Sequence, residues 1–103
     1  MVQNAPMTEA MYYLLLALIK PAHGYWLMQQ VNKVSSGRVS MGPGTLYGLL
    51  GKMQKEGYIE LEGQDERRKT YALTDLGRRA LKQEYQRLQA LVEDGKKVQV
   101  ERL

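Results

Sequence analysis

Two groups of cationic side chains could bind an anion. Lys52 and Lys55 lie three positions apart, and Arg67, Arg68 and Lys69 are consecutive. Ammonium and guanidinium groups hold phosphate through charge-assisted hydrogen bonds, and neither group breaks a covalent bond by itself. The chemistry that these residues offer is therefore the binding of a negatively charged partner.

Residues for catalysis and metal binding are scarce. The chain has no cysteine, which excludes a disulfide scaffold, a thiolate nucleophile and thiolate-ligated zinc or iron–sulfur centres. His23 is the only histidine. Glu60 and Glu62 fall on the predicted solvent face of a strand, and no glycine-rich phosphate loop follows a strand. We expect no enzyme, no catalytic residue, no metal and no cofactor.

The segment 42–56 places small and polar residues along one side of a predicted helix. Pro43 suits a first helical turn, and Gly57 suits a stop. At 100° per residue, one face carries Leu46, Leu49, Leu50 and Met53. The opposite stripe consists of Gly44, Gly48, Gly51 and Lys55, flanked by Thr45, Tyr47 and Lys52.

This stripe of glycines has an energetic cost that calls for a reason. Glycine inside a helix costs about 0.8–1 kcal/mol relative to alanine, so Gly48 and Gly51 together cost about 2 kcal/mol. We infer that something approaches the stripe closely, and a nucleic-acid groove or a second helix would both do so. Pro43 and Gly44 would let backbone N–H groups meet a phosphate, and they also fit simple turn geometry.

Capping residues and hydrophobic periodicity predict the elements that position these side chains. Thr8 and Thr74 are predicted N-caps, Pro21 stops the first helix, and Gly95 ends the last one. Alternation in two strands places four side chains on one face: Ile59, Leu61, Tyr71 and Leu73. The predicted elements are helices at residues 8–20, 24–34, 42–56 and 75–95 and strands at residues 58–62 and 69–73.

The order of these elements predicts a mainly α fold with a small β-hairpin, in the α+β class. Three helices followed by a hairpin with a basic tip are typical of the winged helix-turn-helix. In that fold the third helix enters the major groove of DNA, and the hairpin, or wing, reaches nearby phosphates. We assign residues 8–74 to this domain, residues 1–7 to a flexible N-terminus, residues 75–95 to a dimerisation helix and residues 96–103 to a frayed tail.

Apolar surface on the first and last helices predicts a homodimer. Every residue from 10 to 19 is apolar or tyrosine, so this helix must be covered on all sides, and a chain of 103 residues has few elements to cover it. The last helix carries a seam at coiled-coil spacing, formed by Leu81, Tyr85, Leu88 and Val92. A partner chain would cover both surfaces.

Charge and hydropathy favour a cytoplasmic protein without membrane contacts. The net charge of +4 weakly favours a nucleic acid or another anionic partner. The longest apolar run has ten residues, whereas a bilayer span needs about 20. No basic residue precedes this run, so it does not have the pattern of a secretory signal.

Four stretches resemble the PadR family of winged-helix transcriptional regulators. They are TEAMYYLLLAL, PAHGYWLMQQV, GRVSMGPGTLYGLLGKMQKEGYIE and RRKTYALTDLGR. The resemblance spans residues 7–92, and its most specific part is GPGTLY at residues 42–47, supported by HGY at residues 23–25. The short tail is similar to the compact subgroup with a single C-terminal helix. Gly51 stands where many relatives carry a basic residue, and Trp26 stands where a smaller residue is common.

The resemblance implies a homodimer with interlocked first and last helices. Predicted dimer contacts are Leu14, Leu81, Tyr85, Leu88 and Val92. It also implies repression by binding to a palindromic operator in double-stranded DNA, at the protein's own or an adjacent promoter. Release by a small aromatic effector is a further implication.

We expect DNA contacts from Tyr25, Pro43, Gly44, Thr45, Tyr47, Lys52, Lys55, Arg67, Arg68 and Lys69. Several of these residues could instead have a purely structural role. The Tyr47 ring could pack on a neighbouring helix, the two lysines could form a solvated face, and Asp65 or Glu66 could pair with the wing cations.

Tyr12, Tyr13 and Trp26 are candidates for an aromatic effector pocket between protomers, because a planar ligand gains from apolar burial and offset stacking. Aromatic residues at helical spacing are also typical of a core. The alternative function is a winged-helix protein-interaction module without DNA binding, since acidic and basic residues nearly balance across residues 51–79.

Overall fold

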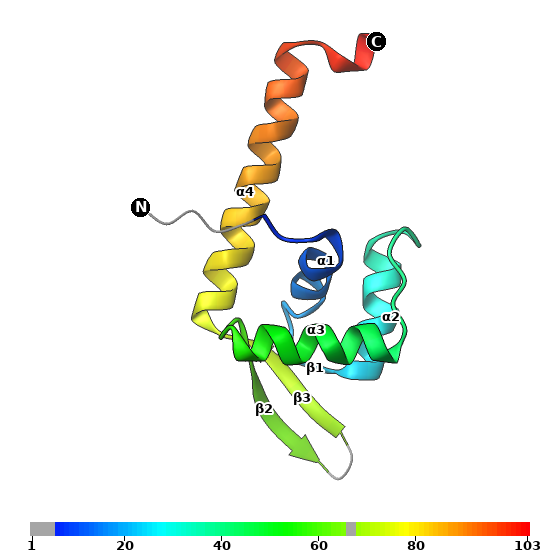
Figure 1. Ribbon diagram of the computed structural model, residues 1–103, viewed down its shortest axis with the longest axis vertical. Coiled ribbons are helices and arrows are strands. Elements are labelled where there is room, and N and C mark those ends of the chain that lie inside the picture. The colour runs from blue at the N-terminus through cyan, green and yellow to red at the C-terminus, as the bar shows by residue number, and fades with distance from the viewer. Residues whose placement is uncertain (1–5, 66–67) are drawn as a thin grey trace.

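The computed structural model describes residues 6–65 and 68–103 and confirms the α+β winged-helix fold (Figure 1). The elements in chain order are α1 (Glu9–Ala17), β1 (Ala22–His23), α2 (Gly24–Val34), α3 (Pro43–Lys55), β2 (Ile59–Asp65), β3 (Arg68–Leu73), α4 (Asp75–Lys97) and a short 3-10 turn, η1 (Val100–Arg102).

Both predicted threonine caps are confirmed. The Thr8 hydroxyl accepts a hydrogen bond from the Met11 N–H at 3.1 Å, and the Thr74 hydroxyl accepts one from the Gly77 N–H at 3.0 Å. Helix α1 ends at Ala17, earlier than the predicted residue 20. The N–H of Ile19 bonds to the residue three before it, which tightens the last turn ahead of Pro21.

The wing is part of a three-stranded antiparallel sheet with the order β1-β3-β2. Strand β1 pairs Ala22 with Tyr71, and no sequence pattern predicted it because it has only two residues. Leu61 takes the predicted face, since it pairs with Tyr71 two positions from the Ile59–Leu73 pair, but its side chain is 40% exposed whereas that of Ile59 is 2% exposed. A register shift between Leu61 and Gly63 interrupts the alternation, and β2 beyond Ile59 leaves the body of the domain.

The core surrounds α1. Leu14 and Leu15 of α1 and its C-cap Leu18 are buried against side chains of α2, α3 and the wing strands, including Leu27, Val31, Leu46, Leu50, Met53 and Ile59. The inner face predicted for α3 is therefore confirmed, with Leu49 half-buried. The chain covers most of the apolar α1 by itself, so the expectation that a partner must cover this helix is wrong for its inner face. Leu14 in particular has no exposed surface for a partner to contact.

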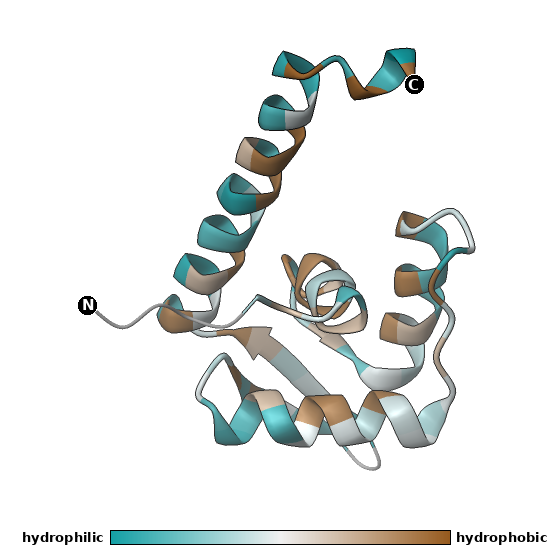
Figure 2. Ribbon diagram, turned by 45° about the horizontal axis from the view of Figure 1, so that its top comes forward, coloured by the Kyte–Doolittle hydropathy of each residue, from teal (hydrophilic) through white to brown (hydrophobic). Residues whose placement is uncertain are grey.

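Helix α4 begins against the domain and then projects away from it (Figure 1). Its buried residues end at Glu84, and hydrophobic residues continue along one side of the projecting part (Figure 2). The predicted end at Gly95 is wrong, because α4 continues to Lys97. Ion pairs Glu93–Lys96 and Asp94–Lys97 support the last turn, and the left-handed residue Gln99 (φ 63°) follows it. No helix among the described residues is long and apolar enough to span a membrane.

Candidate nucleic-acid interface

The outward stripe of α3 is open. A Cβ atom built on Gly44, Gly48 or Gly51 would meet nothing within 4 Å. No part of the chain that the structure describes packs on these glycines, so their missing side chains serve no contact within the described chain. The flanking residues Pro43, Thr45, Tyr47, Lys52 and Lys55 are all exposed. This helix face can therefore approach the surface of a partner at backbone distance.

The first turn of α3 has exposed residues and no side-chain cap. Gly42 is the N-cap, in an extended conformation, and no side chain caps the helix. Pro43 follows as the first helical residue, so the free N–H groups of the turn belong to Gly44 and Thr45. Uncapped N–H groups at the positive end of a helix can donate hydrogen bonds to an anion.

The wing carries exposed cations. Arg68 and Lys69 open β3 and are both exposed, whereas Arg67 lies outside the described residues. Asp65 is opposite Arg68 in the strand register. Among residues 6–65 and 68–103, no ion pair joins Arg68 or Lys69 to an acidic side chain, so both charges are available to an external anion.

Tertiary structure brings the start of α2, the middle of α3 and the start of β3 around one hollow of about 390 Å³. It is lined by His23, Gly24, Tyr25, Tyr47, Arg68, Lys69 and Tyr71. Four of these were predicted as DNA contacts from separate stretches of sequence. Tyr71 was not predicted as a DNA contact, because strand alternation indicates which face its side chain takes and not whether its hydroxyl is open to solvent.

Tyr47 lies across the first turn of α2 at the edge of this hollow. A Cβ on Gly24 would be 2.5 Å from the Tyr47 Oη atom and 2.8 Å from its Cζ atom. Tyr47 nevertheless remains 51% exposed. One side of the ring therefore packs on the neighbouring helix while the other faces outward. Packing on a helix and contact with DNA, the two interpretations of Tyr47 from the sequence, are therefore compatible.

The phenol of Tyr71 stays protonated. Burial raises the pKa of Tyr71, and the neighbouring Tyr47 raises it further. The Tyr71 hydroxyl is consequently a neutral hydrogen-bond donor on a residue of a hollow whose charged lining residues, Arg68 and Lys69, are cations.

The three effector candidates lie on two helices. Tyr12 and Tyr13 of α1 meet edge to face with ring centres 6.0 Å apart, and Arg38 donates a hydrogen bond to the Tyr13 hydroxyl. Burial raises the pKa of Tyr12, and the nearby Tyr85 and Glu84 on α4 raise it further. Trp26 is on α2 and is 38% exposed. The Tyr12–Tyr13 contact is the one ring pair among the described residues, and it does not include Trp26.

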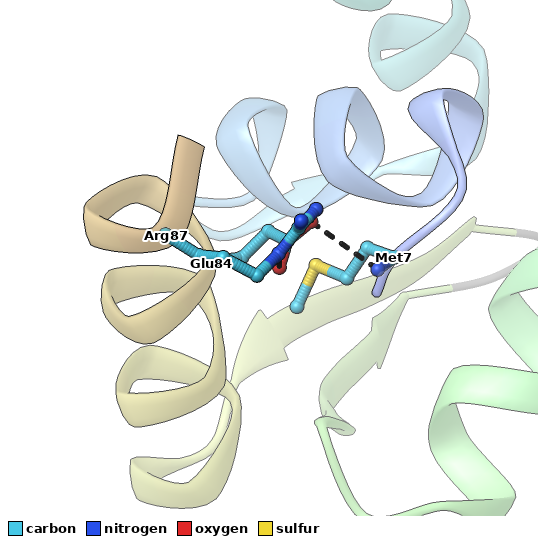
Figure 3. Close-up of polar contacts among 3 residues, drawn as sticks. All are labelled: Met7, Glu84 and Arg87. Atoms are coloured by element: carbon cyan, nitrogen blue, oxygen red, sulfur yellow. Dashed lines mark hydrogen bonds and ion pairs between the residues drawn. The ribbon is translucent and has the colours of Figure 1, made fainter. Parts of the chain in front are cut away.

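A buried carboxylate ties α4 to the segment before α1 (Figure 3). Glu84 accepts hydrogen bonds from the Met7 N–H at 3.3 Å and from Arg87 Nε and Nη2 at 2.8 and 2.6 Å. The bond from Arg87 lowers the pKa of Glu84, against the opposing effect of burial. Sequence reasoning missed this cluster because the Met7 N–H is 77 residues from Glu84 in the chain, and no helical spacing encodes that contact.

Metal ligands are not gathered in the part of the chain that the structure describes: no three His, Cys, Asp or Glu side chains come close enough to hold an ion. The arrangement as a whole is that of a winged-helix domain with an open, glycine-lined third helix and an anion-seeking hollow beside its wing.

The model of the transcriptional regulator PadR-like family matches residues 14–83. The chain therefore belongs to the PadR-like family of transcriptional regulators, which are not enzymes. Comparison with curated protein sequences found no match.

Several solved structures share this fold. A PadR family transcription regulator from Clostridium difficile R20291 has 22% identity and a TM-score of 0.76, over 88% of this chain and 98% of that one. A PadR family transcriptional regulator from Eggerthella lenta DSM 2243 has 25% identity and a TM-score of 0.70, over 85% and 79%. Bacillus subtilis PadR in complex with operator DNA has 27% identity and a TM-score of 0.65, over 78% of this chain and 48% of that one.

Proposed function

We propose that the protein is a homodimeric, sequence-specific DNA-binding regulator that inserts α3 into the major groove. The observation that carries this proposal is the open stripe of Gly44, Gly48 and Gly51, which no part of the described chain covers. Small residues let the helix backbone come close to base edges. Similarity to a PadR protein solved with operator DNA supports the same function.

Each group at the interface has a distinct role. Thr45 and Tyr47 reach base edges or the phosphates beside them, and the N–H groups after Pro43 meet a phosphate. Lys52 and Lys55 neutralise phosphates along the groove. Arg67, Arg68 and Lys69 do so on the wing, together with Tyr25 at the start of α2. Because Gly51 offers no cation where the family resemblance leads us to expect one, affinity depends more on Lys52, Lys55 and the wing.

A second copy of the chain covers the projecting part of α4. Tyr85 and Val92 are 51% and 58% exposed, and Leu88 is half-buried between them in the sequence. Leu81 is only 8% exposed and packs within its own chain, so the seam begins after it. A dimer that sets two recognition helices about 34–36 Å apart fits successive major grooves, which requires a palindromic operator.

When the dimer occupies such an operator at its own or an adjacent promoter, it represses transcription. A small planar aromatic effector that binds near Tyr12, Tyr13 and Trp26 at the protomer interface would shift α4 and release the DNA. Burial of its apolar faces between aromatic rings supplies the binding energy.

The test is a footprint on DNA upstream of the protein's own gene, at about 150 mM salt. We expect a protected palindrome, and charge reversal of Lys52 and Lys55 to glutamate should abolish it. The matched control reverses Lys20 and Lys33, which are exposed cations outside α3 and the wing and form no ion pair with a described residue. Binding no tighter than to random DNA would reject the proposal in favour of a protein-interaction module.

A further inference from the structure

Among residues 6–65 and 68–103, the Tyr71 hydroxyl has no hydrogen-bond partner. Tyr71 is only 7% exposed, and its hydroxyl bonds to no described residue. Every fully buried side-chain nitrogen or oxygen among the described residues does have a partner. The Tyr71 oxygen must therefore reach solvent, and Tyr71 is one of the residues that line the hollow. A largely buried donor left open at one point calls for an external acceptor.

The surroundings of this hydroxyl favour an anion. Tyr25, Tyr47, Arg68 and Lys69 line the same hollow, and no acidic residue is among its lining residues. Helix α2 begins there at Gly24, and its N-cap His23 makes no side-chain capping bond. The site therefore combines two cations, phenolic donors and the positive end of an 11-residue helix.

We propose that this hollow binds one phosphate group of the duplex backbone, with the Tyr71 hydroxyl as a donor at its base. A tetrahedral phosphate accepts hydrogen bonds from several directions, which matches donors supplied by α2, α3 and β3. The hollow lies between the recognition helix and the wing, where a strand of DNA would pass from one to the other. This inference rests on the proposed function and adds Tyr71 to its contacts.

The experiment compares Tyr71→Phe with the wild-type chain on the operator duplex. The substitution removes one oxygen and keeps the packed ring, so thermal stability should be unchanged. A hydrogen bond to a charged acceptor corresponds to about a tenfold difference in affinity, so the operator should bind about tenfold more weakly. Tyr58→Phe is the matched control, since Tyr58 is half-buried and does not line the hollow.

Salt dependence separates a phosphate ligand from a merely structural tyrosine. Arg68→Gln and Lys69→Gln should each reduce the slope of log affinity against log salt by about 0.9, whereas Tyr71→Phe should weaken binding without changing the slope. Combining Tyr71→Phe with Arg68→Gln should give losses that are not additive, because both groups contact one phosphate. Additive losses would overturn the proposal, as would Tyr71→Phe binding like Tyr58→Phe.

A titration of the whole chain with inorganic phosphate, followed by NMR, distinguishes the remaining outcomes and does not require a substitution. At matched ionic strength, phosphate but not chloride should shift the signals of His23 and Tyr25. If these signals move and no duplex binds, the hollow is a site for free phosphate and the proposed function fails. If the duplex binds while neither phosphate nor duplex moves them, the proposed site is refuted and the function stands.

Discussion

Replacing Gly24 with alanine should weaken DNA binding while leaving the fold intact. The new methyl group would be 2.5 Å from Tyr47 Oη, 2.8 Å from Cζ and 2.9 Å from Cε1. Non-bonded carbon atoms are comfortable at about 3.5–4.0 Å, so the ring must move by about 1 Å. Tyr47 is 51% exposed and can move outward into solvent.

The expected cost falls on binding because the displaced atom, Tyr47 Oη, belongs to a proposed DNA contact. Gly24 itself is buried, but the atoms that its methyl group would meet belong to the half-exposed ring of Tyr47, which can move towards solvent. Alanine also favours the helix over glycine by about 0.8–1 kcal/mol, which offsets part of the crowding. A shift of about 1 Å takes the Tyr47 hydroxyl out of the 2.5–3.0 Å range of an O–H···O hydrogen bond. Losing a hydrogen bond to a phosphate costs about 1.5–3 kcal/mol, which corresponds to at least a tenfold weaker complex.

The assay pairs thermal unfolding with fluorescence anisotropy on a labelled operator. Gly95→Ala is the control, because its Cβ would meet only Val100 Cγ2, at an ordinary 3.7 Å. In a Tyr47→Ala background the ring is gone, so Gly24→Ala should have no further effect on affinity. The reasoning is refuted if Gly24→Ala binds like the wild type, or if it weakens binding equally with and without the Tyr47 ring.

Three other substitutions test the framework of the domain. Gly77→Ala places a Cβ 2.0 Å from the backbone oxygen of Tyr58, which cannot move aside alone, so we expect a loss of about 3 kcal/mol and a Tm lower by at least about 10 °C. Glu84→Gln should lower the Tm near neutral pH. Because the Arg87 hydrogen bond depresses the folded pKa of Glu84, its contribution is present above the unfolded value of about 4.5 and is lost on further acidification, so the Tm difference should shrink there. Val92→Glu puts a charge in the exposed seam of α4 and should yield monomers in light scattering, and a persistent dimer would contradict the proposed seam.

Local sequence patterns were sufficient for the elements and their faces. Thr8 and Thr74 act as caps because a hydroxyl can bond to an N–H group three residues on, whatever the rest of the chain does. Helical periodicity placed Leu46 and Leu50 inward and the glycines of α3 outward, since a helix has a fixed angle per residue. The open, glycine-lined face of α3 was therefore predictable before any contact between elements was known.

Contacts between distant residues were decided only by tertiary packing. Gly24 meets Tyr47, Gly77 meets Tyr58, and Glu84 meets Met7, although each pair is far apart in the chain. No periodicity encodes such pairs, because they depend on how close two elements come and at what angle. The Tyr71 hydroxyl follows the same rule, since alternation fixes which face a side chain takes and only the packed neighbours determine whether its polar end finds a partner.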